Sequence, residues 1–236
     1  MSKVVFSVVL PCYNEAENLL MILAGYRRVW RDSCELVLVN NGSTDNTAKF
    51  LEQELAKAEN SFVRSVLVPV NQGYGYGVMA GVRTAKGEVI AVSHADMQCD
   101  PLDVFRAYDR LIANSGNPAL VKGKRAPRAF TASLVTAGMA AIASTVLMTR
   151  LTDINAQPKV FSRSLVEHLT NAPNGFELDL CILYTAHRLG WKIFEIPVIF
   201  GTRMHGSSKW AFSLASRRKH IWATLKYIFK LRHSYA

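Results

Sequence analysis

Short apolar runs of strand length alternate along the first 100 residues with segments in which apolar residues recur at helical spacing. The strand-like runs are Val4–Leu10, Glu35–Val39, Val63–Val68 and Glu88–Val92. Helical spacing marks residues 19–26, 48–55 and 78–84, the last a short helix before Gly87. This alternation predicts a parallel sheet with right-handed crossovers. The continuous apolar strands predict a sheet that helices cover on both faces.

A polar loop follows each of the four predicted strands. The loops are residues 11–15, 40–43, 71–75 and 94–98. Ligands of open α/β sheets bind beyond the carboxyl ends of the strands, so we expect these loops to meet and form one site.

The last of these loops carries candidate metal ligands. Asp96 offers a carboxylate and Gln98 a carbonyl oxygen, and oxygen atoms are the ligands that hard divalent cations prefer. If the chain continues extended, residues two apart point the same way, which places His94 on the same side. The alternative is an Asx turn or a helix cap before Pro101.

The other loops allow two interpretations each. Glycines at 73, 75 and 77 let backbone N–H groups approach an anion at the start of a helix, but a plain loop before a helix has the same composition. Tyr13 can stack on a nucleotide base or pack on the first predicted helix. Glu15 can bind a nucleotide or begin that helix, where a carboxylate is favourable.

Two later segments add candidate chemistry. Glu177 and Asp179 lie at the start of a predicted helix. One of the two carboxylates can stabilise the helix by interacting with the positive end of its dipole, and the other can serve as a general base. Arg203, His205 and Lys209 lie in a loop with a glycine. They form either a phosphate clamp or a solvated basic loop.

The charge is concentrated at the C-terminal end. The net charge is +10, and no acidic residue follows Glu195. The eight basic residues beyond it are Arg203, Lys209, Arg217, Arg218, Lys219, Lys226, Lys230 and Arg232. The rest of the chain holds 20 basic against 18 acidic residues. A nearly neutral body with a basic end indicates an anionic partner, but no nucleic-acid module is recognisable, so we expect no nucleic acid.

The last predicted helix is amphipathic. Its apolar residues are expected on one face and its lysines on the other. The apolar set is Ile221, Trp222, Leu225, Ile228 and Phe229, and the lysines are Lys219, Lys226 and Lys230. This pattern predicts an interfacial helix on anionic lipid, and the alternative is a terminal helix packed on its own domain.

Residues 129–149 contain no charge, and about 20 apolar residues can span a bilayer. The stretch is rich in small residues, which favours a helix buried against the domain or lying at a lipid interface over a span. The N-terminus lacks the apolar stretch of a signal peptide. Four scattered cysteines fit reduced thiols better than a zinc site. We therefore expect a cytoplasmic protein, peripheral at the inner face of the membrane.

Several motifs, in order, resemble the family 2 inverting nucleotide-sugar glycosyltransferases of the GT-A fold. VVLPCYNEAENL resembles the family start V-x-x-P-x-Y-N-E-x-x-N-L, and VLVNNGSTDNT resembles V-D-D-G-S-x-D-x-T. NQGYGYGVMAG and SHADMQCDP resemble N-x-G-x-G-x-A-x-x-x-G and the metal motif D-A-D-x-Q-x-x-P. Residues 175–200 and the segment RMHGSSKW resemble the polyprenyl-phosphate branch, which includes dolichyl-phosphate mannose synthases.

The resemblance implies roles for particular residues. The residues expected to bind the nucleotide are Pro11, Tyr13, Glu15, Asn41 and Asp96, and Asn41 stands at the position that contacts the base. The residues expected to bind a Mg or Mn ion, which in turn binds the diphosphate, are Asp96, Gln98 and His94. The residues expected to bind phosphate are Arg203 and Lys209. The acceptor-side acids are Asp179, the expected base for a hydroxyl acceptor, and Glu177; an ionised phosphate acceptor needs no base.

Three departures from the family pattern change these expectations. Asn40 and Asn41 replace two aspartates, so a carboxylate contact to the base or ribose is lost. His94 replaces the first aspartate of the metal motif, so weakened metal binding is expected. Residues 157–159, Gln-Pro-Lys, stand where the family has Gly-Phe-Arg, after the T-D of residues 152–153.

The sequence thus predicts an α/β, GT-A (Rossmann-like) fold with a mostly parallel sheet sandwiched by helices. Residues 1–210 form the glycosyltransferase domain, about 1–100 as the nucleotide-binding half and 101–210 as the acceptor half, and residues 211–236 form the basic helix. The predicted reaction moves a sugar, with inversion, from a UDP- or GDP-linked donor to a polyprenyl phosphate or a cell-surface glycan or glycolipid. The alternative is a weak or inactive nucleotide-sugar-binding protein, and a homo-oligomer is left open.

Overall fold

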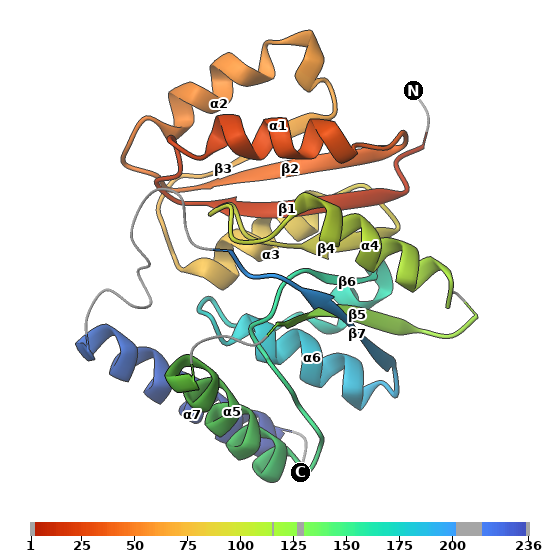
Figure 1. The fold of residues 1–236 in the computed structure, drawn as a ribbon. Coiled ribbons are helices and arrows are strands. Elements are labelled where there is room, and N and C mark those ends of the chain that lie inside the picture. Colours follow the sequence, from red (N-terminus) through yellow and green to blue (C-terminus); the bar gives the residue numbers. More distant parts are fainter. Residues whose placement is uncertain (1–2, 115, 127–129, 202–213, 235–236) are drawn as a thin grey trace.

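The computed structural model describes residues 3–114, 116–126, 130–201 and 214–234. Over these ranges the chain forms a seven-stranded sheet with helices on both faces (Figure 1). The strands are β1 (Phe6–Cys12), β2 (Cys34–Asn41), β3 (Val63–Val68), β4 (Val89–Val92), β5 (Ala119–Arg125), β6 (Lys159–Ser162) and β7 (Lys192–Val198). The α-helices are α1 (Leu19–Val29), α2 (Thr47–Leu55), α3 (Tyr74–Thr84), α4 (Pro101–Ile112), α5 (Phe130–Leu147), α6 (Leu178–Arg188) and α7 (Leu214–Ser234), with 3₁₀ turns η1 (Ala58–Asn60) and η2 (Arg163–His168).

The sheet is mostly parallel, as the sequence predicts. Its strand order is β3-β2-β1-β4-β6-β5-β7. β1 pairs in parallel with β2 and β4, β2 with β3, and β5 with β7, whereas β6 runs antiparallel to both of its neighbours. The four strands expected in the first 100 residues are all present, with ends shifted by at most two residues.

Two cores lie on the two faces of the sheet because successive strand side chains point to opposite sides. Val9, Val37 and Val39 face α3, α5, α6 and α7. Val8, Leu10 and Leu36 face α1, α2 and α4. In Figure 1, α1 and α4 lie in front of the sheet and α3 lies behind it. The predicted cover on both faces is therefore confirmed.

Helix α3 begins four residues earlier than the predicted start at Val78, so two of the three glycines expected in a loop lie inside it. Gly73 precedes the helix with φ +117°, a conformation that only glycine adopts easily. A Cβ atom on Gly81 would lie 2.5 Å from Cγ1 of Val9 and 2.6 Å from Cγ2 of Val39. A Cβ atom on Gly77 would meet the side chain of Asn41, and one on Gly75 would meet the backbone of residues 173–175. Gly77 and Gly81 therefore let the helix lie close to the sheet, and Gly75 lets it lie close to the segment before α6. A role of these glycines in phosphate binding stays a prediction.

Most of the uncharged stretch at residues 129–149 forms α5, which packs against α7. The two helices lie side by side in Figure 1. Ala140, Ala143 and Leu147 are buried, whereas Ile142 and Met148 are exposed. Over the described ranges, no helix is both long and apolar enough to cross a membrane.

The face of α7 that packs on the domain differs from the predicted apolar face. Ile228 and Leu231 are buried, but Trp222 is 63% exposed and Phe229 51% exposed. At 3.6 residues per turn, the five predicted apolar residues lie within about a third of the circumference of α7, and the three lysines lie outside that arc, as expected. The domain covers only part of this apolar face, and Lys226 borders the exposed part.

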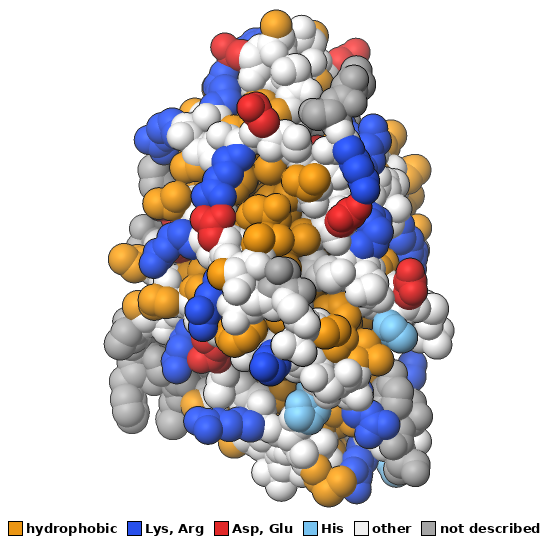
Figure 2. Space-filling model, turned by 90° about the vertical axis from the view of Figure 1, so that its right-hand side faces the viewer, with side chains coloured by type: hydrophobic (Ala, Val, Ile, Leu, Met, Phe, Trp, Pro, Cys, Tyr) orange, Lys and Arg blue, Asp and Glu red, His pale blue; other side chains and the backbone are white. Residues whose placement is uncertain are grey.

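Lys and Arg side chains do not form a continuous basic surface on the face of the molecule shown in Figure 2. On that face they lie interspersed with Asp and Glu side chains and around exposed hydrophobic ones. Lys3 pairs with Glu88, Arg27 with Glu59, and Arg31 with Asp109.

Candidate functional site

The candidate site lies where the strand order reverses. The chain proceeds from β1 outward to β2 and β3, and then returns to place β4 on the other side of β1. A crevice forms at such a switch point, beyond the carboxyl ends of the strands, and it is where ligands of open α/β sheets bind. The loops after β1 and β4 therefore flank the expected donor site.

Hydrogen bonds join the loop after β1 to the loop after β2. The backbone N–H of Asn14 donates to Oγ of Ser43 (3.1 Å), and that of Glu15 donates to Oγ1 of Thr47 (3.0 Å). Oδ1 of Asn14 accepts from the backbone N–H of Thr44 (2.8 Å). Asn14 has φ +57°, which asparagine tolerates better than most residues. The polar residues of the G-S-T-D-N-T segment thus fix the loop that follows β1.

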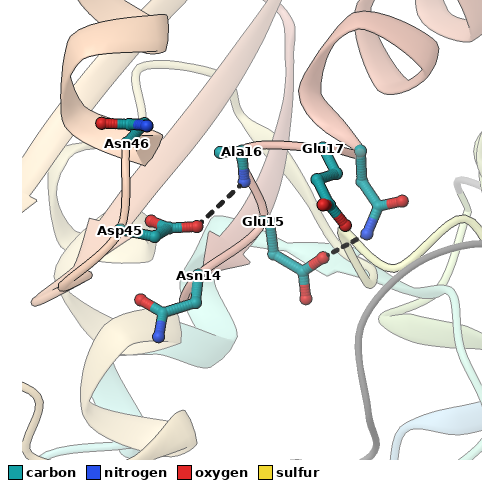
Figure 3. Close-up of a pocket in the computed structure, with 7 residues that line it drawn as sticks. Asn14, Glu15, Ala16, Glu17, Asp45 and Asn46 are labelled. Atoms are coloured by element: carbon teal, nitrogen blue, oxygen red, sulfur yellow. Dashed lines mark hydrogen bonds between the residues drawn. The ribbon is translucent and has the colours of Figure 1, made fainter.

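A cavity of about 200 Å³ lies between these two loops (Figure 3). Figure 3 shows the carboxylate of Asp45 directed at the backbone N–H of Ala16, at 3.4 Å. The carboxylate of Glu15 turns instead to Nδ2 of Asn18 (2.5 Å), at the start of α1. Glu15 therefore helps to begin the helix, and its contact with a nucleotide stays a prediction, as do the roles of the half-buried Pro11 and Tyr13.

The two asparagines at the end of β2 each hold a neighbouring backbone. Oδ1 of Asn40 accepts from the N–H of Ser43 (3.1 Å), which fixes the turn at Gly42. Nδ2 of Asn41 donates to the carbonyl of Gly73 (3.0 Å), just before α3. Oδ1 of Asn41 is buried and has no hydrogen-bond partner in the described part of the chain. The amide of Asn41 donates a hydrogen bond that a carboxylate at this position could not donate.

Replacing Asn41 with aspartate is expected to destabilise the fold. The introduced carboxylate could not donate to Gly73 and would place a charge beside its carbonyl oxygen. Leaving a buried polar group unsatisfied costs about 1–3 kcal/mol, which lowers the melting temperature by roughly 2–12 °C in a chain of this size. Thermal unfolding followed by circular dichroism measures the change, with the exposed Asn46→Asp as the control. An unchanged melting temperature for Asn41→Asp would contradict this account of the asparagine.

The loop after β4 places the predicted metal ligands on a tight turn. Oδ1 of Asp96 accepts from the backbone N–H of Gln98 (3.1 Å), and Met97 between them has φ +61°. Nε2 of Gln98 donates to the carbonyl of Gly201 (2.9 Å). The Asx turn considered as an alternative is thus present, while Asp100 caps α4 through the N–H of Leu102 (2.9 Å). Asp96 itself is buried at the edge of the sheet.

His94 lies in an enclosed aromatic environment. Its ring centroid is 6.0 Å from that of Tyr74 and 6.3 Å from that of Phe200. Tyr74 in turn stacks on Phe176, at 5.1 Å. Burial lowers the pKa of the His94 imidazole, although the carboxylates of Asp96 and Asp179 act in the opposite direction. His94 is therefore a neutral ring at neutral pH, with a nitrogen lone pair where the family has a second carboxylate.

Asp179 on α6 is held by two residues from the segment that departs from the family pattern. Its Oδ1 accepts from Nζ of Lys159 (2.6 Å) and from Nε2 of Gln157 (2.8 Å). Lys159 is 0% exposed and Asp179 2% exposed. Burial lowers the pKa of the Lys159 ammonium, and Asp179 acts to raise it. Asp179 is thus half of a buried ion pair, and its role as a base stays a prediction.

Gln157 connects this ion pair to the aromatic group around His94. Its Nε2 also approaches the hydroxyl of Tyr74, at 3.2 Å. Glu177 is buried and occupies the position just before α6. The structure thus brings Asp179, Gln157, Lys159, Tyr74 and His94 together at the carboxyl end of β4.

Two more ion pairs, both made by basic residues of β5, were missed by sequence reasoning. Arg125, at the end of β5, pairs with Asp153. Lys122 of β5 pairs with Glu195 of β7 at 3.0 Å and is almost fully buried. The signal in the sequence was a basic residue within an apolar strand, which is seldom buried without a partner. Arg203 and Lys209, the predicted phosphate ligands, lie outside the described residues.

Known proteins resemble this chain in sequence and in fold. The family model "Glycosyl transferase family 2" matches residues 7–127. An uncharacterized glycosyltransferase of Mycobacterium tuberculosis (strain H37Rv) is 32% identical over 218 residues, which cover 88% of this chain and 90% of the relative. An undecaprenyl-phosphate 4-deoxy-4-formamido-L-arabinose transferase of Pseudomonas fluorescens (strain Pf0-1) is 28% identical, and the match covers 87% of this chain but only 60% of that enzyme.

A solved structure has the same fold. Glucosyl-3-phosphoglycerate synthase of M. tuberculosis, crystallised with Mn²⁺, UDP and glucosyl-3-phosphoglycerate, superposes with a TM-score of 0.71 and 22% identity. The superposition covers 95% of this chain and 79% of the synthase. The fold is therefore that of the GT-A glycosyltransferases. With the family match and the relative of similar length, these findings show that the chain belongs to glycosyl transferase family 2 and is a glycosyltransferase.

Proposed function

We propose that this enzyme moves a sugar from a nucleotide sugar to a phosphate-bearing polyprenyl acceptor, with inversion at the anomeric carbon. The observation that carries the proposal is the position of the Asp96 turn, beyond β4 and beside β1 at the switch point of the sheet. A nucleoside diphosphate placed there would meet the loops at residues 13–15 and 40–43 with its nucleoside. Its diphosphate would lie toward Asp96.

The residues at the turn fit a divalent cation. Asp96 supplies a carboxylate, and Gln98, whose amide nitrogen is used by Gly201, has its carbonyl oxygen left as a ligand. His94 adds a neutral imidazole. No cluster of three or more His, Cys, Asp or Glu side chains exists in the described ranges, so the ligand set would be completed by phosphate oxygens and water, as is usual for Mg²⁺. The bound metal would offset the negative charge of the leaving diphosphate.

The acceptor assignment rests on Asp179. A general base needs an accessible lone pair within reach of the proton that it removes. Asp179 already accepts two hydrogen bonds at one oxygen, and its partner Lys159 offsets its charge. A phosphate oxygen is ionised at neutral pH and attacks without a base, whereas a sugar hydroxyl does not. This difference favours a phosphate acceptor over a glycan hydroxyl, and a relative that transfers to undecaprenyl phosphate agrees with it.

The outward face of α7 supports contact with a membrane surface at the cytoplasmic side. Trp222 and Phe229 are exposed on this face. Exposed basic residues surround them: Arg218, Lys219, Lys226 and Lys230. Aromatic and basic side chains on one helix face suit the boundary of an anionic bilayer, where a polyprenyl phosphate would be presented.

Replacing Trp222 and Phe229 with serine is expected to lower the fraction of protein bound to anionic vesicles by about tenfold or more, because two exposed apolar side chains would no longer be buried in lipid. Co-sedimentation with phosphatidylglycerol vesicles measures it. Leu67→Ser is the matched control, because Leu67 is also exposed but lies on the edge strand β3. Equal binding of the double variant and the original chain would refute the role of α7.

One experiment tests the proposed reaction. The affinity of the purified chain for UDP and for GDP is measured by titration, each with and without Mn²⁺. The labelled donor is then a sugar linked to the nucleotide that binds more tightly. Transfer is compared between undecaprenyl phosphate and undecaprenol. We expect product only with the phosphate and inversion of the anomeric configuration. Transfer to the alcohol, or donor hydrolysis alone, would overturn the proposed acceptor.

A further inference from the structure

A second cavity lies away from the catalytic loops. Its volume is about 530 Å³, within the range of small-molecule sites, which is roughly 300–1,000 Å³. It lies between α3, the segment after η2, α6 and α7. None of the residues assigned above to the nucleotide, the metal or the acceptor carboxylates lines it. It is therefore separate from the donor site.

The rim of this cavity is cationic. Arg83 of α3 and Lys230 of α7 line it and are exposed, and His168 lies beside them. Neither Arg83 nor Lys230 forms an ion pair within the described ranges. Among the described residues that line the cavity, none is acidic. The rim therefore favours an anionic group, and a phosphate accepts hydrogen bonds from both arginine and lysine.

Five of the described residues that line the cavity are buried, and we call these five its floor. Four of them are apolar, namely Met79, Leu169, Cys181 and Leu231, and the fifth is Thr185. Half-buried tyrosines, Tyr76 and Tyr227, and exposed polar residues such as Asn171 also line the cavity. A free phosphate ion would leave the floor unused, whereas a chain of methylene groups would raise the affinity by about fourfold for each group that it buries there. The site thus has two parts, one for a charged head and one for an apolar tail.

Helix α7 places this cavity next to the face that carries Trp222 and Phe229. Lys230 lies at the boundary, because it is exposed with the aromatic residues and also lines the cavity. A lipid could reach the cavity from that side of the helix. This step uses the exposed face of α7, and it does not depend on sugar transfer.

We propose that this cavity binds a phosphate monoester on an apolar chain, with the phosphate at Arg83 and Lys230 and the chain over Met79 and Leu231. Such a site would hold one anionic lipid beside the catalytic domain, in addition to the substrates at the catalytic edge. A lipid is favoured over a free phosphate ion because the floor contributes only with a chain attached.

The test is calorimetric titration of the full chain with octyl phosphate, compared with inorganic phosphate and with octanol. We expect octyl phosphate to bind at one site, and each of the other two to bind at least about tenfold more weakly. The Arg83→Gln/Lys230→Gln double variant is expected to weaken octyl phosphate binding about tenfold or more. Both side chains are exposed, so this variant should fold, and circular dichroism checks that it does.

Matched controls come from α7 and from the residues just after α3. Lys86→Gln and Lys226→Gln remove exposed cations that do not line the cavity, and both should bind octyl phosphate normally.

Three outcomes would overturn the proposal. Equal weakening of octyl phosphate binding in the control variants would mean general charge attraction. Equal binding of inorganic phosphate would identify a free-phosphate site, and displacement by UDP with Mn²⁺ would place the probe at the donor site; both outcomes would also overturn it. If no sugar is transferred to undecaprenyl phosphate but octyl phosphate still binds as expected, the proposed reaction is wrong and the proposed lipid site is not affected.

Discussion

Replacing Asp96 with alanine is expected to lower the turnover of sugar transfer by at least about 100-fold. Asp96 is the one carboxylate among residues 93–98 of the loop after β4, and it lies at the switch point of the sheet. His94 in this loop cannot replace the lost negative charge, because an imidazole is either neutral or positively charged. The leaving diphosphate would then lose the protein's carboxylate ligand for its metal.

The measurement combines kinetics with binding. Turnover is measured with the preferred nucleotide sugar, and the affinity for Mn²⁺ in the presence of nucleoside diphosphate is measured by electron paramagnetic resonance. Both should fall in Asp96→Ala. Asp100→Ala is the matched control: it removes the cap of α4, which costs about 1 kcal/mol of stability, and should leave turnover nearly unchanged. Near-normal turnover in Asp96→Ala would remove Asp96 from the metal site.

The fold followed from the sequence because the burial of apolar side chains is the main force that drives folding. Continuous apolar strands require cover on two faces, and the helical stripe of Leu19, Ile22, Leu23 and Tyr26 is buried as that cover. The start of α3 was missed because glycines ordinarily weaken a helix. Here Gly77 and Gly81 are required by close approach to Asn41 and to two valines of the sheet. That requirement becomes visible only when the strands and the helix are in place.

The loops that form the candidate site could be predicted from the sequence, but the ion pairs beside them could not. The rule that ligands bind beyond the carboxyl ends of parallel strands located the loops at β1, β2 and β4. By contrast, Lys159 and Asp179 are separated by 20 residues and meet only because β6 inserts next to β4. For α7, the periodicity predicted the helix but not which face packs on the domain, since Trp222 and Phe229 are as apolar as the buried Ile228.

Removing either partner of the Lys159–Asp179 pair is expected to cause a large loss of stability. Lys159→Met leaves a buried carboxylate with only Gln157 as donor, and Asp179→Asn leaves a buried ammonium without its counter-charge. Breaking a buried pair in this way costs about 3–5 kcal/mol, which corresponds to a fall in melting temperature of roughly 6–20 °C. The double variant Lys159→Met/Asp179→Asn leaves no unpaired charge and should recover most of the loss. Thermal and urea unfolding of the three variants measure the coupling, and additive losses would contradict it.

The double variant also separates the structural role of Asp179 from a role as a base. It lacks the carboxylate but keeps an acceptor for Gln157, so the surroundings of Tyr74 and His94 should be preserved. If the acceptor is an ionised phosphate, the double variant should transfer sugar within about tenfold of the original rate, since general base catalysis contributes about 10²–10⁴-fold where it operates. A fall of that size in a variant whose stability is restored would make Asp179 the base and the acceptor a hydroxyl. The single variant Asp179→Asn cannot decide this, because the unpaired Lys159 would lower both stability and activity.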